Sequence, residues 1–196
     1  MANTQAPFGF RQWSGTGSAP TYEQVAVRIA YNASAIYYGD PVLPDANGYV
    51  VAGAPGSTQI AGIFAGCKYL SVAQKRTVWS NFWPGSDVAS GNIVEGYIIN
   101  DPNAKFVVQA GGSATAIDAT AINANANFGI GTGNSATGIS GAFLDQTTLG
   151  TTNTLPFRVI SLVQDPPGAN GTDITSGYNN VVVAFNNVST KQLTGV

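Results

Sequence analysis

The fold class is decided by residues 25–31, which read Val25-Ala26-Val27-Arg28-Ile29-Ala30-Tyr31. Large apolar side chains occupy every second position, and small or charged residues stand between them. Because successive side chains of a strand point to opposite faces of a sheet, this alternation predicts a half-buried β-strand.

A hairpin is predicted further along, where Asn47-Gly48 separates Val42-Leu43 from Tyr49-Val50-Val51. Asn-Gly favours a two-residue hairpin turn because both residues tolerate a positive φ. Further strands are predicted in short apolar runs bounded by turn residues, namely Gln59–Phe64, Cys67–Leu70, Thr77–Ser80, Ile93–Ile99, Phe106–Gln109, Phe157–Val163 and Asn180–Phe185. Since no segment has the pattern of an amphipathic helix, we expect an all-β fold, a compact β-barrel or sandwich.

Residues 1–22 are predicted to form an extended N-terminal arm, and residues 23–196 a single β-rich domain. The glycines and prolines of the arm are incompatible with a helix. Its large aromatic residues, Phe8, Phe10 and Trp13, nevertheless need to be buried. They either fold back onto their own domain or dock on a neighbouring molecule, and the second alternative makes them candidate interface residues.

Residues 111–141 consist mostly of Gly, Ala, Ser, Thr and Asn, and Asp118 is their only charged residue. Such a composition is also typical of a flexible linker. Large apolar residues, among them Phe128 and Ile130, recur through the segment, and a linker does not require them. We therefore expect closely packed strands of small residues and long Gly/Ala/Asn-rich loops.

Charged residues make up only 9% of the 196 residues, and the formal net charge is −2. A nearly neutral chain has no overall attraction to nucleic acid or to an anionic membrane, so we expect neither as a partner. The chain contains no histidine and a single cysteine, which excludes His-based catalytic triads, His-ligated metals and an intrachain disulfide. We expect no cofactor, no metal site and no enzymatic activity.

Two residues, Glu95 and Cys67, are considered as possible reactive groups. Glu95 lies in the apolar run Ile93–Ile99, where it is either partly buried with a raised pKa or directed outward into solvent. Cys67 stands beside Lys68, whose charge would activate the thiol. We favour a small buried core residue at this position, and no other group converges on either side chain.

The densest group of aromatic residues lies in the stretch Thr77-Val78-Trp79-Ser80-Asn81-Phe82-Trp83-Pro84-Gly85. Clustered aromatic side chains can form a platform for stacking sugars, an anchor in a protein interface, or a plug in the core. Trp79, Phe82 and Trp83 therefore join the candidate interface residues.

A set of stretches rich in glycine, proline and aromatic residues runs through about residues 20–165. They are Tyr37–Val42, Ala46–Val50, Ile60–Tyr69, Trp79–Gly85, Ile99–Asn103, Thr137–Asp145 and Leu155–Val163. These stretches resemble the head cement, or capsid decoration, proteins of tailed bacteriophages. Their shared positions are structural ones and carry no catalytic signature.

The resemblance implies a structural protein that binds the outer surface of a phage capsid and stabilises the head by bridging capsomers. Its partner would be the major capsid protein, and it would form a homo-oligomer, with a trimer favoured. Its location would be the virion, on the outer capsid surface, after synthesis in the cytoplasm of the host bacterium. The first residues accordingly lack the basic and apolar segments of a signal peptide.

An alternative function is a carbohydrate- or receptor-binding β module of a tail fibre or an adhesin. A module that binds sugars should leave Trp79 or Trp83 exposed to solvent, beside carboxylates or amides. A cement protein should bury both residues in its core or in a protein contact. The exposure of these tryptophans therefore distinguishes the two functions.

Chelators and reducing agents are expected to leave the fold unchanged, because the sequence provides neither a ligand cluster nor an intrachain disulfide. The melting temperature should be the same with and without an excess of EDTA, and with and without dithiothreitol. A large decrease with EDTA would reveal a metal site that the residue pattern does not predict.

Overall fold

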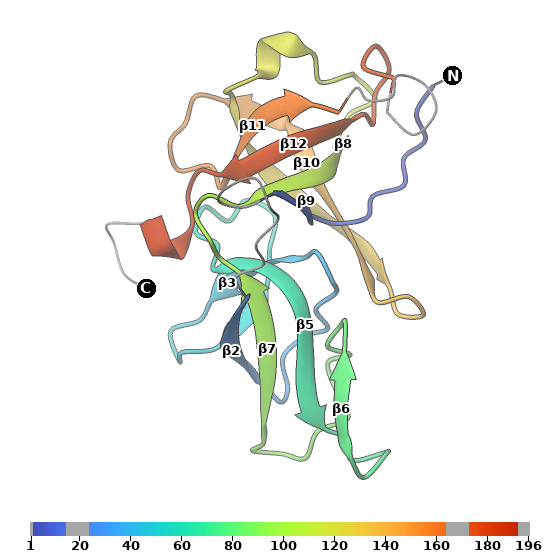
Figure 1. Cartoon of the computed structure of the whole chain (residues 1–196), viewed down its shortest axis with the longest axis vertical. Coiled ribbons are helices and arrows are strands. Elements are labelled where there is room, and N and C mark those ends of the chain that lie inside the picture. The colour runs from blue at the N-terminus through green and yellow to red at the C-terminus, as the bar shows by residue number, and fades with distance from the viewer. Residues whose placement is uncertain (1, 15–23, 164–172, 192–196) are drawn as a thin grey trace.

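The computed structural model describes residues 2–14, 24–163 and 173–191. Within these residues the chain forms twelve strands and two 3₁₀ helices of three residues each, Ala119–Ala121 and Ser189–Lys191. The strands form two sheets that lie one above the other along the long axis of the molecule (Figure 1). The predicted all-β fold is confirmed.

The upper sheet contains β1 (Arg11–Ser14), β8 (Lys105–Gly111), β9 (Asn125–Asn134), β10 (Ile139–Gly150), β11 (Phe157–Leu162) and β12 (Asn180–Phe185). The strand order is β1-β8-β10-β9-β11-β12, and β12 also pairs with β8. Five strands therefore close into a barrel, in which β8 and β10 are parallel and the other neighbours antiparallel. Closure pairs the edges that an open sheet would expose.

The β9–β10 hairpin occupies much of the segment in which we expected packed small-residue strands and long loops. Phe143 of β10 lies opposite Gly129 of β9. A Cβ atom at Gly129 would lie 2.3 Å from Cζ of Phe143, so the missing side chain makes room for the ring. Gly133 accommodates the ring of Tyr37 in the same way. The small residues form strands because aromatic rings from elsewhere pack against them.

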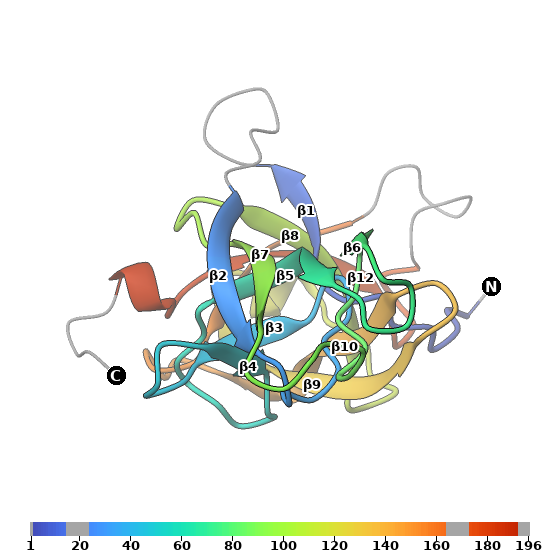
Figure 2. The same cartoon turned by 90° about the horizontal axis from the view of Figure 1, so that it is seen from below.

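The lower sheet contains β2 (Gln24–Ala30), β3 (Pro41–Pro44), β4 (Val50–Ala52), β5 (Gly62–Leu70), β6 (Thr77–Ser80) and β7 (Ile93–Ile99). The strand order is β2-β7-β5-β3-β4, with β6 paired to β5. The predicted hairpin is confirmed, since β3 and β4 are antiparallel. Its turn is wider than the expected two residues: the Gly48 N–H donates to the Asp45 carbonyl at 3.0 Å, and Gly48, but not Asn47, has a positive φ, of 78°. Seen from below, these strands lie in front of the barrel (Figure 2).

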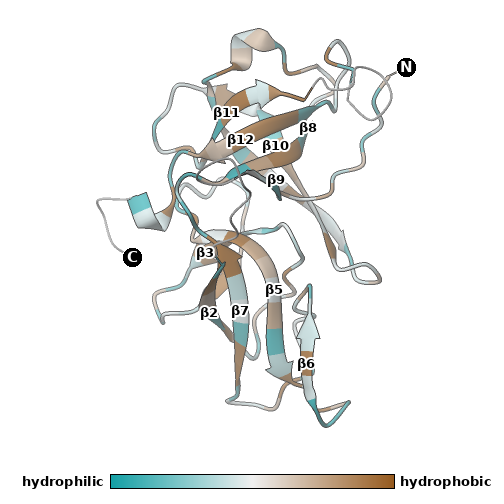
Figure 3. Ribbon diagram, viewed as in Figure 1, coloured by the Kyte–Doolittle hydropathy of each residue, from teal (hydrophilic) through white to brown (hydrophobic). Residues whose placement is uncertain are grey.

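Two hydrophobic clusters form the core, one inside the barrel and one against the lower sheet. The barrel cluster contains the fully buried Phe106, Phe128 and Phe157. β5 contributes to both clusters, because Ile63 packs into the barrel cluster and the next residue, Phe64, into the other. Hydrophobic residues are most prominent in β8, β11, β12 and the upper part of β5, whereas β9 and β10 are paler because they are rich in Gly, Asn and Thr (Figure 3).

The described part of the N-terminal arm, residues 2–14, is integrated into its own domain. Arg11 pairs with Val107 of β8, and the ring of Phe10 stacks on Phe157 with centroids 4.3 Å apart. Phe10 is only 1% exposed, so the interpretation of this residue as an interface residue is wrong. The ring packs inside the barrel because burying an apolar side chain there is more favourable than leaving it in water. Residues 15–22 of the predicted arm lie outside the described residues.

The replacement Phe10→Ala is expected to lower the free energy of unfolding by about 3–5 kcal/mol, the usual cost of removing a buried ring. Phe8→Ala is the matched control, because Phe8 is only half-buried and should cost less. Denaturant unfolding of the two variants tests this. Equal effects would contradict the assignment of Phe10 to the barrel core.

Candidate functional site

The structure separates the aromatic residues that the sequence groups together. Trp83 is fully buried in the core of the lower sheet, where its indole N–H donates to the carbonyl of Ala33 at 3.1 Å. Its interpretation as an interface residue is therefore wrong, and it acts as a core plug. Phe82 is half-buried and stacks on Tyr37. Trp79 is 68% exposed, which is the expectation for a sugar-binding module, and which fits a cement protein if a bound partner covers this side chain.

The two exposed tryptophans lie on different parts of the molecule. Trp13 is 55% exposed and belongs to β1 on the barrel. Trp79 belongs to β6 of the lower sheet. The interface prediction therefore stays a prediction for these two residues and for the half-buried Phe8 and Phe82.

Strand register brings polar groups to Trp79. Lys68 of β5 pairs with Trp79 on one side and with Glu95 of β7 on the other, so all three lie on one face of the sheet. The Lys68 ammonium lies 3.0 Å from Glu95 Oε1 and 5.0 Å from the centroid of the Trp79 ring. The indole is thus held by a cation–π contact with a lysine that is itself fixed by a carboxylate.

Tyr97 completes this arrangement. Its hydroxyl donates to Glu95 Oε1 at 2.6 Å, and its ring is parallel to that of Trp79 within 3°, with centroids 5.8 Å apart. Offset parallel rings attract each other, so the pair adds to the positioning of the indole. Lys68, Trp79, Glu95 and Tyr97, named here the aromatic platform, form one connected group of contacts.

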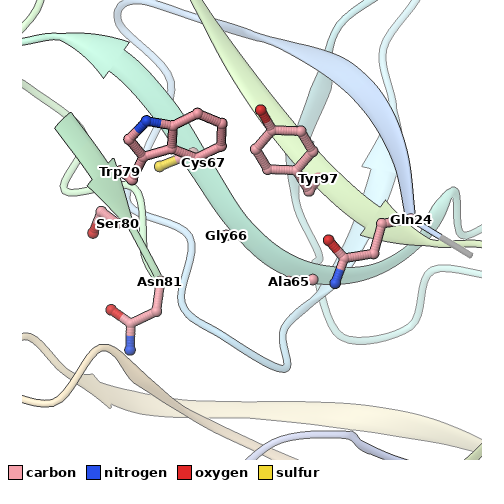
Figure 4. A pocket seen from close by; sticks show the side chains of 8 residues that line it. All are labelled: Gln24, Ala65, Gly66, Cys67, Trp79, Ser80, Asn81 and Tyr97. Atoms are coloured by element: carbon pink, nitrogen blue, oxygen red, sulfur yellow. The ribbon is translucent and has the colours of Figure 1, made fainter. Parts of the chain in front are cut away.

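A hollow of about 500 Å³ adjoins the aromatic platform (Figure 4). Its lining residues are Gln24, Ala65, Gly66, Cys67, Trp79, Ser80, Asn81 and Tyr97. Gly66 leaves the floor free of a side chain, and its φ of 141° disfavours any other residue. A Cβ atom there would also lie 2.9 Å from the Ser80 carbonyl oxygen. The hollow therefore depends on glycine at this position.

The sequence leaves two alternatives for Glu95, a partly buried side chain with a raised pKa or a side chain directed into solvent. The hydrogen bond from Tyr97, followed by that from Lys68, lowers the pKa of Glu95 below its ordinary value of 4.5. A raised pKa, one of the alternatives considered for this residue, is therefore wrong. Glu95 instead points toward solvent, since its side chain is 42% exposed. It shares this face of the sheet with Lys68 and Trp79.

Cys67 points to the other face of β5, into the core of the lower sheet. Burial raises the pKa of its thiol to about 12. The thiolate is therefore scarce at neutral pH, and the residue is unreactive by this route. The interpretation of Cys67 as a buried core residue is confirmed.

Within the described residues, no group of three or more His, Cys, Asp or Glu side chains is placed to hold a metal ion. No helix in that part of the chain is long and apolar enough to cross a membrane. Comparison with protein-family models, with curated proteins and with solved structures finds no match to this chain.

The replacement Tyr97→Phe removes the hydroxyl that donates to Glu95 and keeps the ring that stacks on Trp79. We expect the pKa of Glu95 to rise toward its ordinary value of 4.5. Because the folded pKa lies below the unfolded one, the stability from this carboxylate is present above pH 4.5 and is lost as the pH falls through the folded pKa. The variant should therefore lose less stability on acidification.

An NMR titration of the Glu95 carboxyl carbon measures the pKa directly. Tyr31→Phe serves as the control, because Tyr31 is an exposed tyrosine that does not line the hollow. An unchanged pKa of Glu95 in Tyr97→Phe would show that the hydroxyl is not its main stabilising partner.

Proposed function

We propose that this protein is a structural cement, or decoration, protein that binds the outer surface of a tailed-phage capsid and stabilises the head by bridging capsomers. The major capsid protein is its proposed partner, and a homo-oligomer, with a trimer favoured, its proposed state on the virion. The resemblance over about residues 20–165 suggests this role. The observation that carries the attachment step is a set of exposed apolar side chains at the end of the lower sheet away from the barrel, where the exposed Lys75 and Arg76 also lie.

This end lies at the bottom of Figure 1, farthest from the barrel. Tyr31 follows the end of β2, Leu70 ends β5, Val72 lies in the β5–β6 connection and Ile93 begins β7. These residues, named here the apolar tip, are four of the eight large hydrophobic residues that are exposed in the described part of the chain. Ile93 pairs with Ala30, the residue before Tyr31. Exposed apolar residues at one end of a sheet are candidates for a protein-binding surface.

The magnitude of apolar burial supports such an attachment. Burying a Leu or Ile side chain contributes about 1.5–3 kcal/mol, and copies bound at several points on one particle reinforce each other. Within the described residues, the resemblance positions serve the fold: Gly39 has a φ of 91° at a close backbone contact, and Trp83 fills the core. A stiff β scaffold with an apolar attachment surface suits a role in assembly.

The double variant Leu70→Asp, Ile93→Asp tests the attachment. We expect occupancy on phage particles depleted of the protein to fall by at least about tenfold, because two buried apolar contacts are replaced by charges that require desolvation. The control is Ile122→Asp, which places one aspartate at an exposed apolar residue after the Ala119–Ala121 helix, outside the apolar tip. Binding is measured by sedimentation of the particles with labelled protein.

A salt series completes the test. Apolar attachment should persist to about 0.5 M salt, where charges are screened within a few ångströms. Release between low and physiological salt, or full occupancy by the double variant, would contradict attachment through the apolar tip. No binding of the unmodified protein to depleted particles would contradict the proposed function itself.

A further inference from the structure

The aromatic platform has a free face that the fold does not use. Trp79 is two-thirds exposed, yet its ring is oriented by Tyr97 and by Lys68. Lys68 in turn is fixed by Glu95. A ring that is held in place before a ligand arrives loses little conformational freedom on binding, so this arrangement favours recognition of a flat partner.

The rim of the adjoining hollow is polar and uncharged. Gln24 and Asn81 contribute side-chain amides and Ser80 a hydroxyl. The amides of Gln24 and Asn81 lie across the hollow from the two aromatic rings (Figure 4). The Asn81 Nδ2 donates to the carbonyl of Thr137 at 2.8 Å, and this hydrogen bond fixes the position of the amide.

These properties narrow the chemical class of the ligand. None of the residues that line the hollow carries a charge, so an ionic ligand would find no counter-charge within the hollow itself. A purely apolar ligand would leave the amides without partners, which is costly. A pyranose ring presents C–H groups on its face, which suit the indole of Trp79, and hydroxyls at its edge, which suit the amides of the rim.

We infer that the hollow beside Trp79 binds a neutral oligosaccharide. One pyranose ring stacks its C–H face on the exposed face of the indole, while its hydroxyls bond to the amides of Gln24 and Asn81. The volume of about 500 Å³ lies within the range of small-molecule sites. The inference does not rest on the proposed attachment to capsids, because the residues of the apolar tip do not line the hollow.

The full chain is titrated with cellotetraose, maltotetraose, mannotetraose and N-acetylchitotetraose, and tryptophan fluorescence and calorimetry are recorded. We expect saturable binding of at least one of these sugars. Trp79→Ala should weaken it by at least about tenfold, the usual effect of removing a central aromatic contact. Trp13→Ala, which removes the other exposed tryptophan, should leave the affinity unchanged.

Two further variants keep the test decisive if Trp79→Ala folds poorly. Trp79→Phe keeps a smaller ring and should retain part of the affinity, and Asn81→Ala should weaken binding without changing the ring. Decaproline is titrated as the competing probe, since extended proline-rich peptides also dock on aromatic grooves. Absence of binding to all four sugars, equal binding by Trp79→Ala, or binding of decaproline alone would overturn the inference.

The same variants separate this inference from the proposed function. Asn81→Ala should occupy depleted phage particles as the unmodified protein does, because Asn81 lines the hollow and is not among the candidate interface residues. The Leu70→Asp, Ile93→Asp variant should bind the sugar normally. Loss of sugar binding in the second variant would overturn the separation of the two surfaces and with it the assignment of the sugar to this hollow.

Discussion

The arrangement of the two sheets depends on one close backbone contact, at which three segments of the chain meet. A Cβ atom at Gly9 would lie 2.7 Å from the Cβ of Ser140, and Gly9 and Gly39 both have positive φ values. The Phe10 N–H donates to the carbonyl of Gly39 at 2.9 Å, so the N-terminal segment is fixed to the lower sheet as it enters the barrel core. The buried Asp40 accepts a hydrogen bond from the Ser140 hydroxyl of β10, which ties the lower sheet to the barrel.

This contact fixes one end of the lower sheet and leaves the other end in solvent. The strand β5 runs from the barrel to the exposed end of the lower sheet. Ile63 lies in the barrel cluster, Phe64 lies in the core of the lower sheet, and Leu70 at the opposite end is exposed. A bulge between Phe64 and Gly66 changes the register on the way. Beyond it Lys68 faces Glu95, which organises the aromatic platform. The platform and the apolar tip therefore both belong to the part of the sheet that projects from the barrel.

The fold could be predicted wherever a strand carries its own apolar pattern. β6 and β7 have the predicted bounds, and the Asn47-Gly48 hairpin lies where the turn chemistry indicates it. The two strands predicted at Gln59–Phe64 and Cys67–Leu70 correspond to the single strand β5, where Gly66 lies at a bulge and has a φ of 141°. β9 lacked a clear pattern because part of its packing comes from partner rings such as Phe143, which local sequence cannot assign to it.

Composition and strand alternation are enough to predict the all-β class and to exclude histidine chemistry, because both can be recognised in short stretches of the chain. The sequence favours the burial of Cys67 because no second reactive group accompanies it, and the structure confirms it. Which aromatic side chains are exposed to solvent depends instead on long-range packing. Trp79 and Trp83 stand four residues apart in one aromatic stretch, yet Trp79 lies on the open face of the sheet and Trp83 fills its core. Their positions follow from how β6 pairs with β5 and how the chain then turns toward Ile36, and these are long-range contacts. Exposure is a property of the packed sheet, so no local pattern could have assigned it.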